Sequence, residues 1–248
     1  MAVAHTFFEK SNYPLNICYA ERVEREVPGN NPKANLFEQL AGVAKALSHP
    51  VRLELMEHLA QGERSVDTLA ELVGHSVANT SHHLLLMRRT GLADARKDGV
   101  RVLYRLSGDD VVDLLGSLRK TAERHNAEVE RVLTGYFRSR DDMEPLSREE
   151  LLRRAKNGLV TVLDVRPPDE FASGHLPGAI NIQLSELDKR LKNLPTDHEV
   201  IAYCRGAYCV LSFEAVFLLR KKGFKARRLE EGYPEWRAAG LPVDGTAS

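Results

Sequence analysis

Apolar residues recur at helical spacing through the first half of the chain. The predicted helices span residues 36–47, 48–61, 66–73 and 77–90. Ser48 and Ser76 suit the N-cap positions of the second and fourth helices, and Gly62 ends the second. The last two helices are short and are joined by a tight turn at Gly74, which is typical of a helix-turn-helix.

Two strand-like stretches follow directly, at residues 92–96 and 100–106. Lys97, Asp98 and Gly99 lie between them and suit a hairpin turn. A helix-turn-helix followed at once by a basic β-hairpin predicts a winged helix, a mainly-α fold of the α+β class.

Residues 109–133 carry a stripe at 3/4 spacing and predict one long helix. The stripe consists of Val111, Leu115, Leu118, Ala122, His125, Val129 and Val132. Because the helix follows a module that is already complete, it favours pairing with a second copy of the chain, so we expect a homodimer. Packing back onto the winged helix stays open as the alternative.

The pattern changes after a polar stretch at residues 134–145, which we interpret as a linker. Ser147 and Glu150 form a capping-box pattern at the start of a helix over 147–156. Apolar strands are predicted at 160–165, 179–182, 200–204 and 226–229, and helices at 186–194, 210–222 and 233–239. This alternation predicts an α/β domain over 146–243 with a parallel sheet covered on both faces.

Composition limits the remaining choices. The 248 residues suffice for two domains, and no run of about 18 apolar residues indicates a membrane span. The N-terminus lacks the basic and apolar stretches of a secretory signal. Three cysteines favour a reducing compartment, so we expect a cytoplasmic protein. Residues 1–33 are interpreted as a flexible arm, in which Cys18 is an incidental thiol.

The net charge of the chain is zero, but positive charge is concentrated in the predicted helix-turn-helix and wing. Residues 77–106 contain the basic residues Arg88, Arg89, Arg96, Lys97, Arg101 and Arg105 against the acidic residues Asp94 and Asp98. A local excess of basic residues suits contact with phosphates.

Separated motifs in residues 34–133 resemble the ArsR family. They are Ala46-Leu47-Ser48-His49-Pro50-Val51-Arg52-Leu53, Ser81-His82-His83-Leu84, Gly91-Leu92 and Asp98-Gly99-Val100-Arg101. The resemblance implies a dimeric winged-helix repressor that binds double-stranded operator DNA.

The helix over 77–90 would then read DNA. We expect Val77, Leu84 and Met87 to face the core, and the predicted DNA contacts are Asn79, Ser81, His82, His83, Arg88, Lys97 and Arg101. Whether both adjacent histidines reach DNA, or one packs inside the domain, stays open.

Metal sensing, common in ArsR relatives, has no complete ligand set here. The stretch 65–69 lacks the expected cysteines. His125 and Glu128 keep one half of a second site, but its other positions hold Val112 and Leu114. We therefore expect no metal and no cofactor.

Motifs in residues 146–243 resemble the rhodanese family. They are Asp164-Val165-Arg166, Glu170-Phe171, Gly174-His175-Leu176-Pro177-Gly178-Ala179, Tyr203-Cys204-Arg205-Gly206 and Leu229-Glu230-Glu231-Gly232-Tyr233-Pro234-Glu235-Trp236. The resemblance implies sulfur transfer through a persulfide on Cys204. Asp164, Arg166 and Glu170 are expected to support the cysteine loop.

The position of Cys204, between a strand and a helix N-terminus, suits stabilisation of a sulfur anion, to which Arg205 adds. Related cysteine phosphatases need an arginine six residues on, where this chain has Val210. Cys209 is a second thiol at the end of the loop, where attack on a Cys204 persulfide would give a disulfide or polysulfide bridge. An inert, core-facing Cys209 is the alternative.

These features favour a DNA-binding transcriptional regulator that senses sulfane sulfur or a thiol oxidant. Two alternatives stay open. The chain could be an active sulfurtransferase that uses the winged helix for docking, or a plain thiol-redox switch without sulfur transfer.

Overall fold

The computed structural model describes residues 31–141 and 143–245. Of the expected arm, residues 1–33, only residues 31–33 are described, and Cys18 lies outside the described residues. The described residues divide into two units, residues 31–42 and residues 43–245, and the boundary between them falls within helix α1 (Pro32–Leu47). The described part of the first unit is the start of α1, which begins four residues before the predicted helix.

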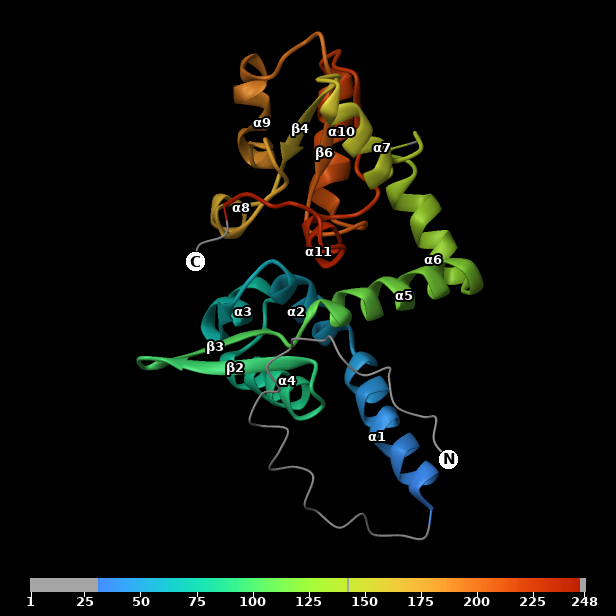
Figure 1. Cartoon of the computed structure of the whole chain (residues 1–248), viewed down its shortest axis with the longest axis vertical. Coiled ribbons are helices and arrows are strands. Elements are labelled where there is room, and N and C mark those ends of the chain that lie inside the picture. The colour runs from blue at the N-terminus through green and yellow to red at the C-terminus, as the bar shows by residue number, and fades with distance from the viewer. Residues whose placement is uncertain (1–30, 142, 246–248) are drawn as a thin grey trace, which may run out of the picture. The chain divides into compact units, whose positions relative to one another are not determined.

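The second unit opens with the remaining elements of a winged helix (Figure 1). They are α2 (Pro50–Ala60), β1 (Arg64–Ser65), α3 (Val66–Leu72), α4 (Val77–Arg89), β2 (Ala93–Asp98) and β3 (Arg101–Leu106). Ser65 and Ser76 cap α3 and α4 by accepting hydrogen bonds from Thr68 and Asn79. The hairpin turns at Gly99, whose φ of 60° favours glycine, and the strands form an antiparallel sheet in the order β1-β3-β2.

The winged helix has its own apolar core, into which α2 and α4 both project. Leu55, Met56 and Leu59 of α2 are buried with Leu84 and Met87 of α4 in one cluster. The predicted core position Val77 is an exception. It is exposed, because it begins the first turn of α4, ahead of the face that meets the core.

The single long helix predicted over residues 109–133 is wrong. The structure has α5 (Asp109–His125) and α6 (Ala127–Val132), separated at Asn126. Asn126 adopts an extended backbone, and its side chain caps α6 by accepting a hydrogen bond from the Glu128 N–H. The start of the stripe also packs intramolecularly, since Val111 is buried in the winged-helix core and Leu115 packs against that core.

The stretch expected to be a linker begins as the helical segment η2 (Leu133–Phe137). Further along, the buried Asp141 accepts a hydrogen bond from Arg228 at 2.8 Å. Residues 134–145 therefore include at least one side chain fixed in the second half of the chain. The domain boundaries drawn from the sequence stay predictions.

The second half is an α/β domain (Figure 1). Its elements are α7 (Arg148–Lys156), β4 (Val160–Asp164), α8 (Pro168–Ser173), β5 (Ile180–Asn181), α9 (Leu184–Arg190), η3 (Leu191–Asn193), β6 (Glu199–Tyr203), α10 (Val210–Lys221), β7 (Ala226–Arg228) and α11 (Tyr233–Ala238). The four strands are parallel in the order β5-β4-β6-β7, so the α/β prediction is confirmed.

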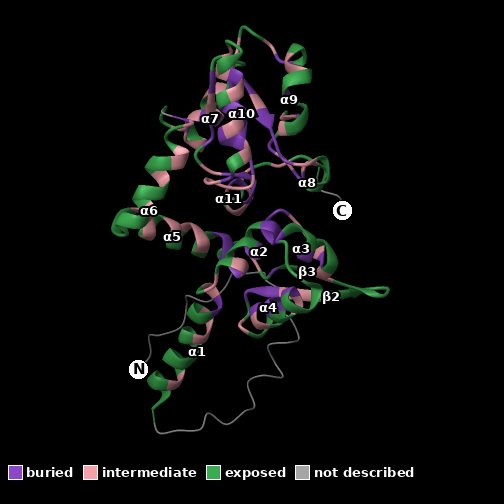
Figure 2. Cartoon of the chain, turned by 180° about the vertical axis from the view of Figure 1, so that it is seen from behind, coloured by how far each residue is buried: buried purple, intermediate pink, exposed green. Residues whose placement is uncertain are grey.

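Both faces of this sheet are covered. In β6, Val200 and Ala202 belong to one apolar cluster, whereas Ile201 and Tyr203 belong to another. Successive side chains of a strand point to opposite faces, so the two clusters lie on the two sides of the sheet. In Figure 2, helix α10 carries the buried colour over part of its length, where residues such as Phe213, Val216 and Leu219 are buried. No helix among the described residues is long and apolar enough to cross a membrane.

Candidate functional site

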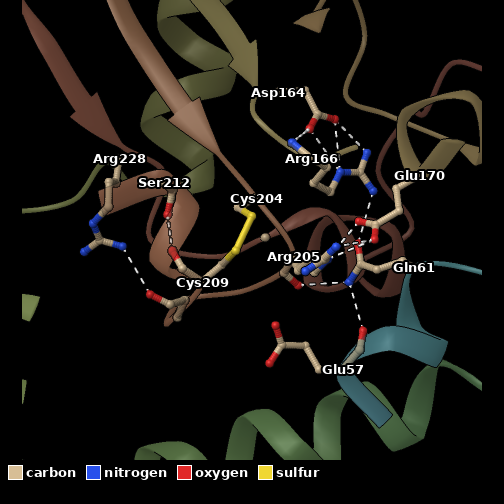
Figure 3. The surroundings of a disulfide bond; sticks show 12 residues. Glu57, Gln61, Asp164, Arg166, Glu170, Cys204, Arg205, Cys209, Ser212 and Arg228 are labelled. Carbon is tan, nitrogen blue, oxygen red and sulfur yellow. Dashed lines mark hydrogen bonds and ion pairs between the residues drawn. A yellow bond between two sulfur atoms is a disulfide. The ribbon is translucent and has the colours of Figure 1, made fainter. Parts of the chain in front are cut away.

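Two cysteines close the loop between β6 and α10. Cys204 follows the last residue of β6, and Cys209 is the N-cap of α10. Their sulfur atoms form a disulfide, with the Cα atoms 6.0 Å apart (Figure 3). Both side chains are buried, with 1% and 7% of their surfaces exposed. We call residues 204–209 the cysteine loop.

The polar residues Asp164 and Arg166 form a fully buried ion pair near this loop. Arg166 Nη2 donates to Asp164 Oδ2 at 2.7 Å and to the Gly174 carbonyl at 2.7 Å. The guanidinium carbon also lies 4.3 Å from the centre of the Tyr233 ring. With both oxygens of the carboxylate occupied, this pair is suited to holding neighbouring backbone and not to exchanging protons.

A second pair acts on the loop itself. Arg205 Nη2 donates to Glu170 Oε1 at 2.7 Å, and Arg205 Nε donates to Glu170 Oε2 at 3.0 Å. The charge of Arg205 is therefore compensated by a buried carboxylate, which weakens the stabilisation of a sulfur anion expected from the sequence. The geometry instead suits a role for both residues in fixing the loop.

Gln61 connects the cysteine loop to helix α2 and was not singled out from the sequence. It is the C-cap residue of α2, and only 1% of its surface is exposed. Its Nε2 donates to the Arg205 carbonyl and to the Glu57 carbonyl, each at 3.2 Å. Its Oε1 accepts from Arg166 Nη1 at 3.1 Å (Figure 3). Arg166 and Arg205 lie 105 and 144 positions away from Gln61 along the chain, so no local pattern could reveal these two contacts.

Arg228 holds the other side of the loop. Its Nη1 donates to the Ala207 carbonyl at 3.2 Å, while its Nε donates to Asp141 Oδ2. Two carbonyls within the cysteine loop, those of residues 205 and 207, are thus bound by side chains from different parts of the chain.

A cavity of about 360 Å³ lies beside the loop. Its lining combines Leu53 and Ala60 of α2, Leu118 and Ala122 of α5, and loop residues including Cys209. Four charged residues, Glu57, Arg119, Arg205 and Glu235, also line the cavity. Cys209 therefore borders a space that the DNA-binding half also lines.

His58 is a buried histidine of α2 close to this region. Burial and the positive charges of Arg205 and Arg64 lower the pKa of His58 to about 4. The ring is therefore neutral near pH 7.

The predicted DNA-contacting residues fall into two groups. Asn79, His82, Arg88, Lys97 and Arg101 are exposed on α4 and the hairpin, and Ser81 is half-buried. His83 is buried, and its ring centre lies 4.5 Å from that of His49 and its Nδ1 lies 3.4 Å from Arg52 Nη1. The burial of His83 fits the alternative left open above, in which one of the two adjacent histidines packs inside the domain.

Two of the six basic residues counted in the sequence are already paired. Arg96 donates to both oxygens of Glu63 at 2.9 Å, and Arg105 lies 3.5 Å from Asp94. The other four make no ion pair with any described residue and are exposed: Arg88, Arg89, Lys97 and Arg101. These four carry the positive charge that is available to phosphates.

Within residues 31–141 and 143–245, no three His, Cys, Asp or Glu side chains are grouped closely enough to hold a metal ion. His125 ends α5, and Glu128 lies beyond the break at Asn126.

Comparison with known families gives two matches. The model for the bacterial regulatory protein arsR family matches residues 49–95, and the model for the rhodanese-like domain matches residues 147–239.

Among curated proteins, the HTH-type transcriptional regulator Rv0324 of Mycobacterium tuberculosis is 44% identical over 212 residues, which cover 86% of this chain and 93% of that protein. Other relatives match one half only. Uncharacterized HTH-type transcriptional regulator Rv0081 of the same organism is 36% identical, covering 36% of this chain and 79% of its own. A protein named Sulfurtransferase from Allochromatium vinosum is 31% identical, covering 41% of this chain and 91% of its own.

Proposed function

We propose that the cysteine loop is the sensor of this regulator, because the chain belongs to the ArsR-type transcriptional regulators that carry a C-terminal rhodanese-like domain. The signal is a sulfane-sulfur donor or thiol oxidant, and the response is a change in affinity for operator DNA. The observation that carries the proposal is the disulfide between Cys204 and Cys209 in a loop that contacts the DNA-binding half.

The chemistry balances with a persulfide donor, R–S–SH. The Cys204 thiolate attacks the outer sulfur, the S–S bond of the donor breaks, and R–S⁻ leaves. The Cys209 thiol then attacks Sγ of the Cys204 persulfide. The disulfide forms and the outer sulfur departs as H₂S, so the two thiols are oxidised and the sulfane sulfur is reduced. Two low-molecular-weight thiols restore the dithiol as they become a disulfide.

On the DNA side, the exposed Asn79 and His82 and the half-buried Ser81 of α4 are proposed to contact bases. Arg88, Lys97 and Arg101 are proposed to contact phosphates. We further propose that the regulator acts as a homodimer in the cytoplasm, as expected for a protein that binds operator DNA. Oxidation would shift the population between dimers that bind DNA and dimers that do not.

The test is a DNA-binding titration of the full-length protein before and after treatment with inorganic polysulfide. The duplex is first selected by the reduced protein from a random-sequence pool. We expect treatment to change the dissociation constant, and Cys204→Ser to abolish that change. An equal response in Cys204→Ser would refute the proposal.

Mass spectrometry of the peptide that holds both cysteines separates the forms of the signal. A direct disulfide shows no added sulfur, whereas a polysulfide bridge retains one or more sulfur atoms. Turnover of thiosulfate and cyanide at ordinary enzyme rates, without sequence-specific DNA binding, would instead select the sulfurtransferase function.

A further inference from the structure

Both N–H donors and the oxygen of the Gln61 amide have partners, and these partners are specific. A carbonyl oxygen only accepts and a guanidinium only donates, so these partners fix which amide atom faces which group. Nε2 faces the carbonyls of Glu57 and Arg205, and Oε1 faces Arg166 (Figure 3). A buried amide in this position is satisfied only while α2 and the cysteine loop keep their present separation.

We infer that Gln61 is the positioning residue that passes the redox state of the cysteine loop to helix α2, and through it to the recognition helix α4. This inference rests on the proposed function and names the route of its regulation.

The first step lies between the sulfur atoms and Gln61. Arg205 lies inside the segment that the disulfide closes, directly after Cys204. Opening the bridge, or lengthening it with sulfur, changes the paths open to the backbone between the two cysteines. Because Gln61 is buried, water cannot readily replace the Arg205 carbonyl, so α2 must move with the loop or leave Nε2 partly unpaired.

The second step lies inside the winged helix. Gln61 ends α2, whose residues Leu55 and Met56 are packed with Leu84 and Met87 of α4. Near the start of α2, Arg52 contacts His83 of α4. Close-packed helices shift as units, so a displacement at the end of α2 reaches the helix that carries the proposed base contacts.

Linkage provides a test that packing alone does not satisfy. If oxidation changes the DNA dissociation constant by some factor, DNA must change the dithiol–disulfide equilibrium constant by the same factor. Both quantities are measurable with full-length protein, by titrating the selected duplex and by equilibrating the cysteines in glutathione buffers with and without that duplex. Allosteric factors are typically about 5- to 150-fold.

Gln61→Glu is the informative variant. Its carboxylate keeps the shape of the amide and can accept from Arg166, but it cannot donate to the Arg205 or Glu57 carbonyls. Gln61→Leu removes all three hydrogen bonds at similar size. Asp169→Asn is the matched control, because it removes the negative charge from the exposed ion pair of Arg64 with Asp169, at 3.2 Å, without touching the cysteine loop.

In Gln61→Glu and Gln61→Leu we expect oxidation to change the DNA dissociation constant, and DNA to change the dithiol–disulfide equilibrium constant, by less than about 3-fold. Cys204 should still accept sulfur in both variants. The Asp169→Asn control should keep both wild-type factors. Retention of the wild-type factor in either folded variant would overturn the inference, as would an equal loss in Asp169→Asn. If wild-type DNA affinity does not respond to oxidation at all, the proposed function fails instead. Should Gln61→Leu not fold, Gln61→Glu alone decides.

Discussion

At the scale of single residues, the two cysteines have separable roles in the proposed chemistry. Cys204 accepts sulfur, and Cys209 resolves the persulfide. In Cys209→Ser we expect polysulfide treatment to leave added sulfur on Cys204, because no second thiol can release it. Mass spectrometry of the intact protein checks this. Loss of sulfur uptake in Cys209→Ser would mean that Cys209 is needed for the first attack.

His58 gives a prediction for the pH dependence of stability. The folded-state pKa of about 4 lies below the ordinary value of 6.5, so the unfolded chain binds a proton first as the pH falls. The contribution of His58 to the free energy of unfolding is therefore fully present above pH 6.5 and is lost as the pH falls toward 4. By linkage, the free energy of unfolding has decreased by about 2 kcal/mol at pH 5.

The prediction is tested by urea unfolding of wild type and His58→Leu at pH values above 7 and near 5. The variant should lose about 2 kcal/mol less than wild type over this interval, whatever its stability at neutral pH. Equal losses in the two proteins would show that His58 is not responsible for the acid sensitivity.

At the scale of elements, α4 presents two neighbouring histidines with opposite surroundings. His82 is exposed and His83 is buried against His49. His82→Ala should weaken specific DNA binding by about 1–3 kcal/mol with little change in melting temperature. His83→Ala should lower the melting temperature because it leaves a cavity between α4 and α2. A melting-temperature loss confined to His82→Ala would reverse this assignment.

The elements themselves were largely predictable, because both cores are built from apolar stripes of regular period. The exceptions have local causes. Helix α8 begins at Pro168 and has only six residues, so it carries too few turns for a period to show. The break after α5 depends on the side chain of Asn126 capping a new helix, within a stripe that continues on both sides.

The cysteine loop could be predicted because its two cysteines are close in sequence, whereas the role of Gln61 could not, because it depends on distant partners. Cys204 and Cys209 are five positions apart between a strand and a helix, so their proximity follows from local structure. The contacts of Gln61, like the burial of His83, depend on surfaces brought together by the fold. A sequence period shows which face of a helix is apolar, but not which distant group a polar residue on that helix will meet.

At the scale of the whole molecule, the predicted homodimer needs an apolar surface that the described residues leave exposed. Leu36 and Phe37 of α1 are more than half exposed, and Leu40 lies one turn further along the same helix, also more than half exposed. Burying each such side chain contributes about 1.5–3 kcal/mol. We therefore expect the double variant Leu36→Glu/Phe37→Glu to raise the dimer dissociation constant at least about 100-fold, measured by sedimentation equilibrium.

Val100→Glu is the control for this experiment, because Val100 is a fully exposed apolar residue at the hairpin tip, away from α1 in sequence. It should leave the dimer dissociation constant unchanged. If the α1 double variant also leaves it unchanged, α1 does not form the dimer surface. The residues to replace would then be Leu114 and Leu118 of α5, which are exposed and lie one turn apart. Because an operator is bound by two recognition helices at once, a variant that dissociates should lose specific DNA binding even with its cysteines reduced.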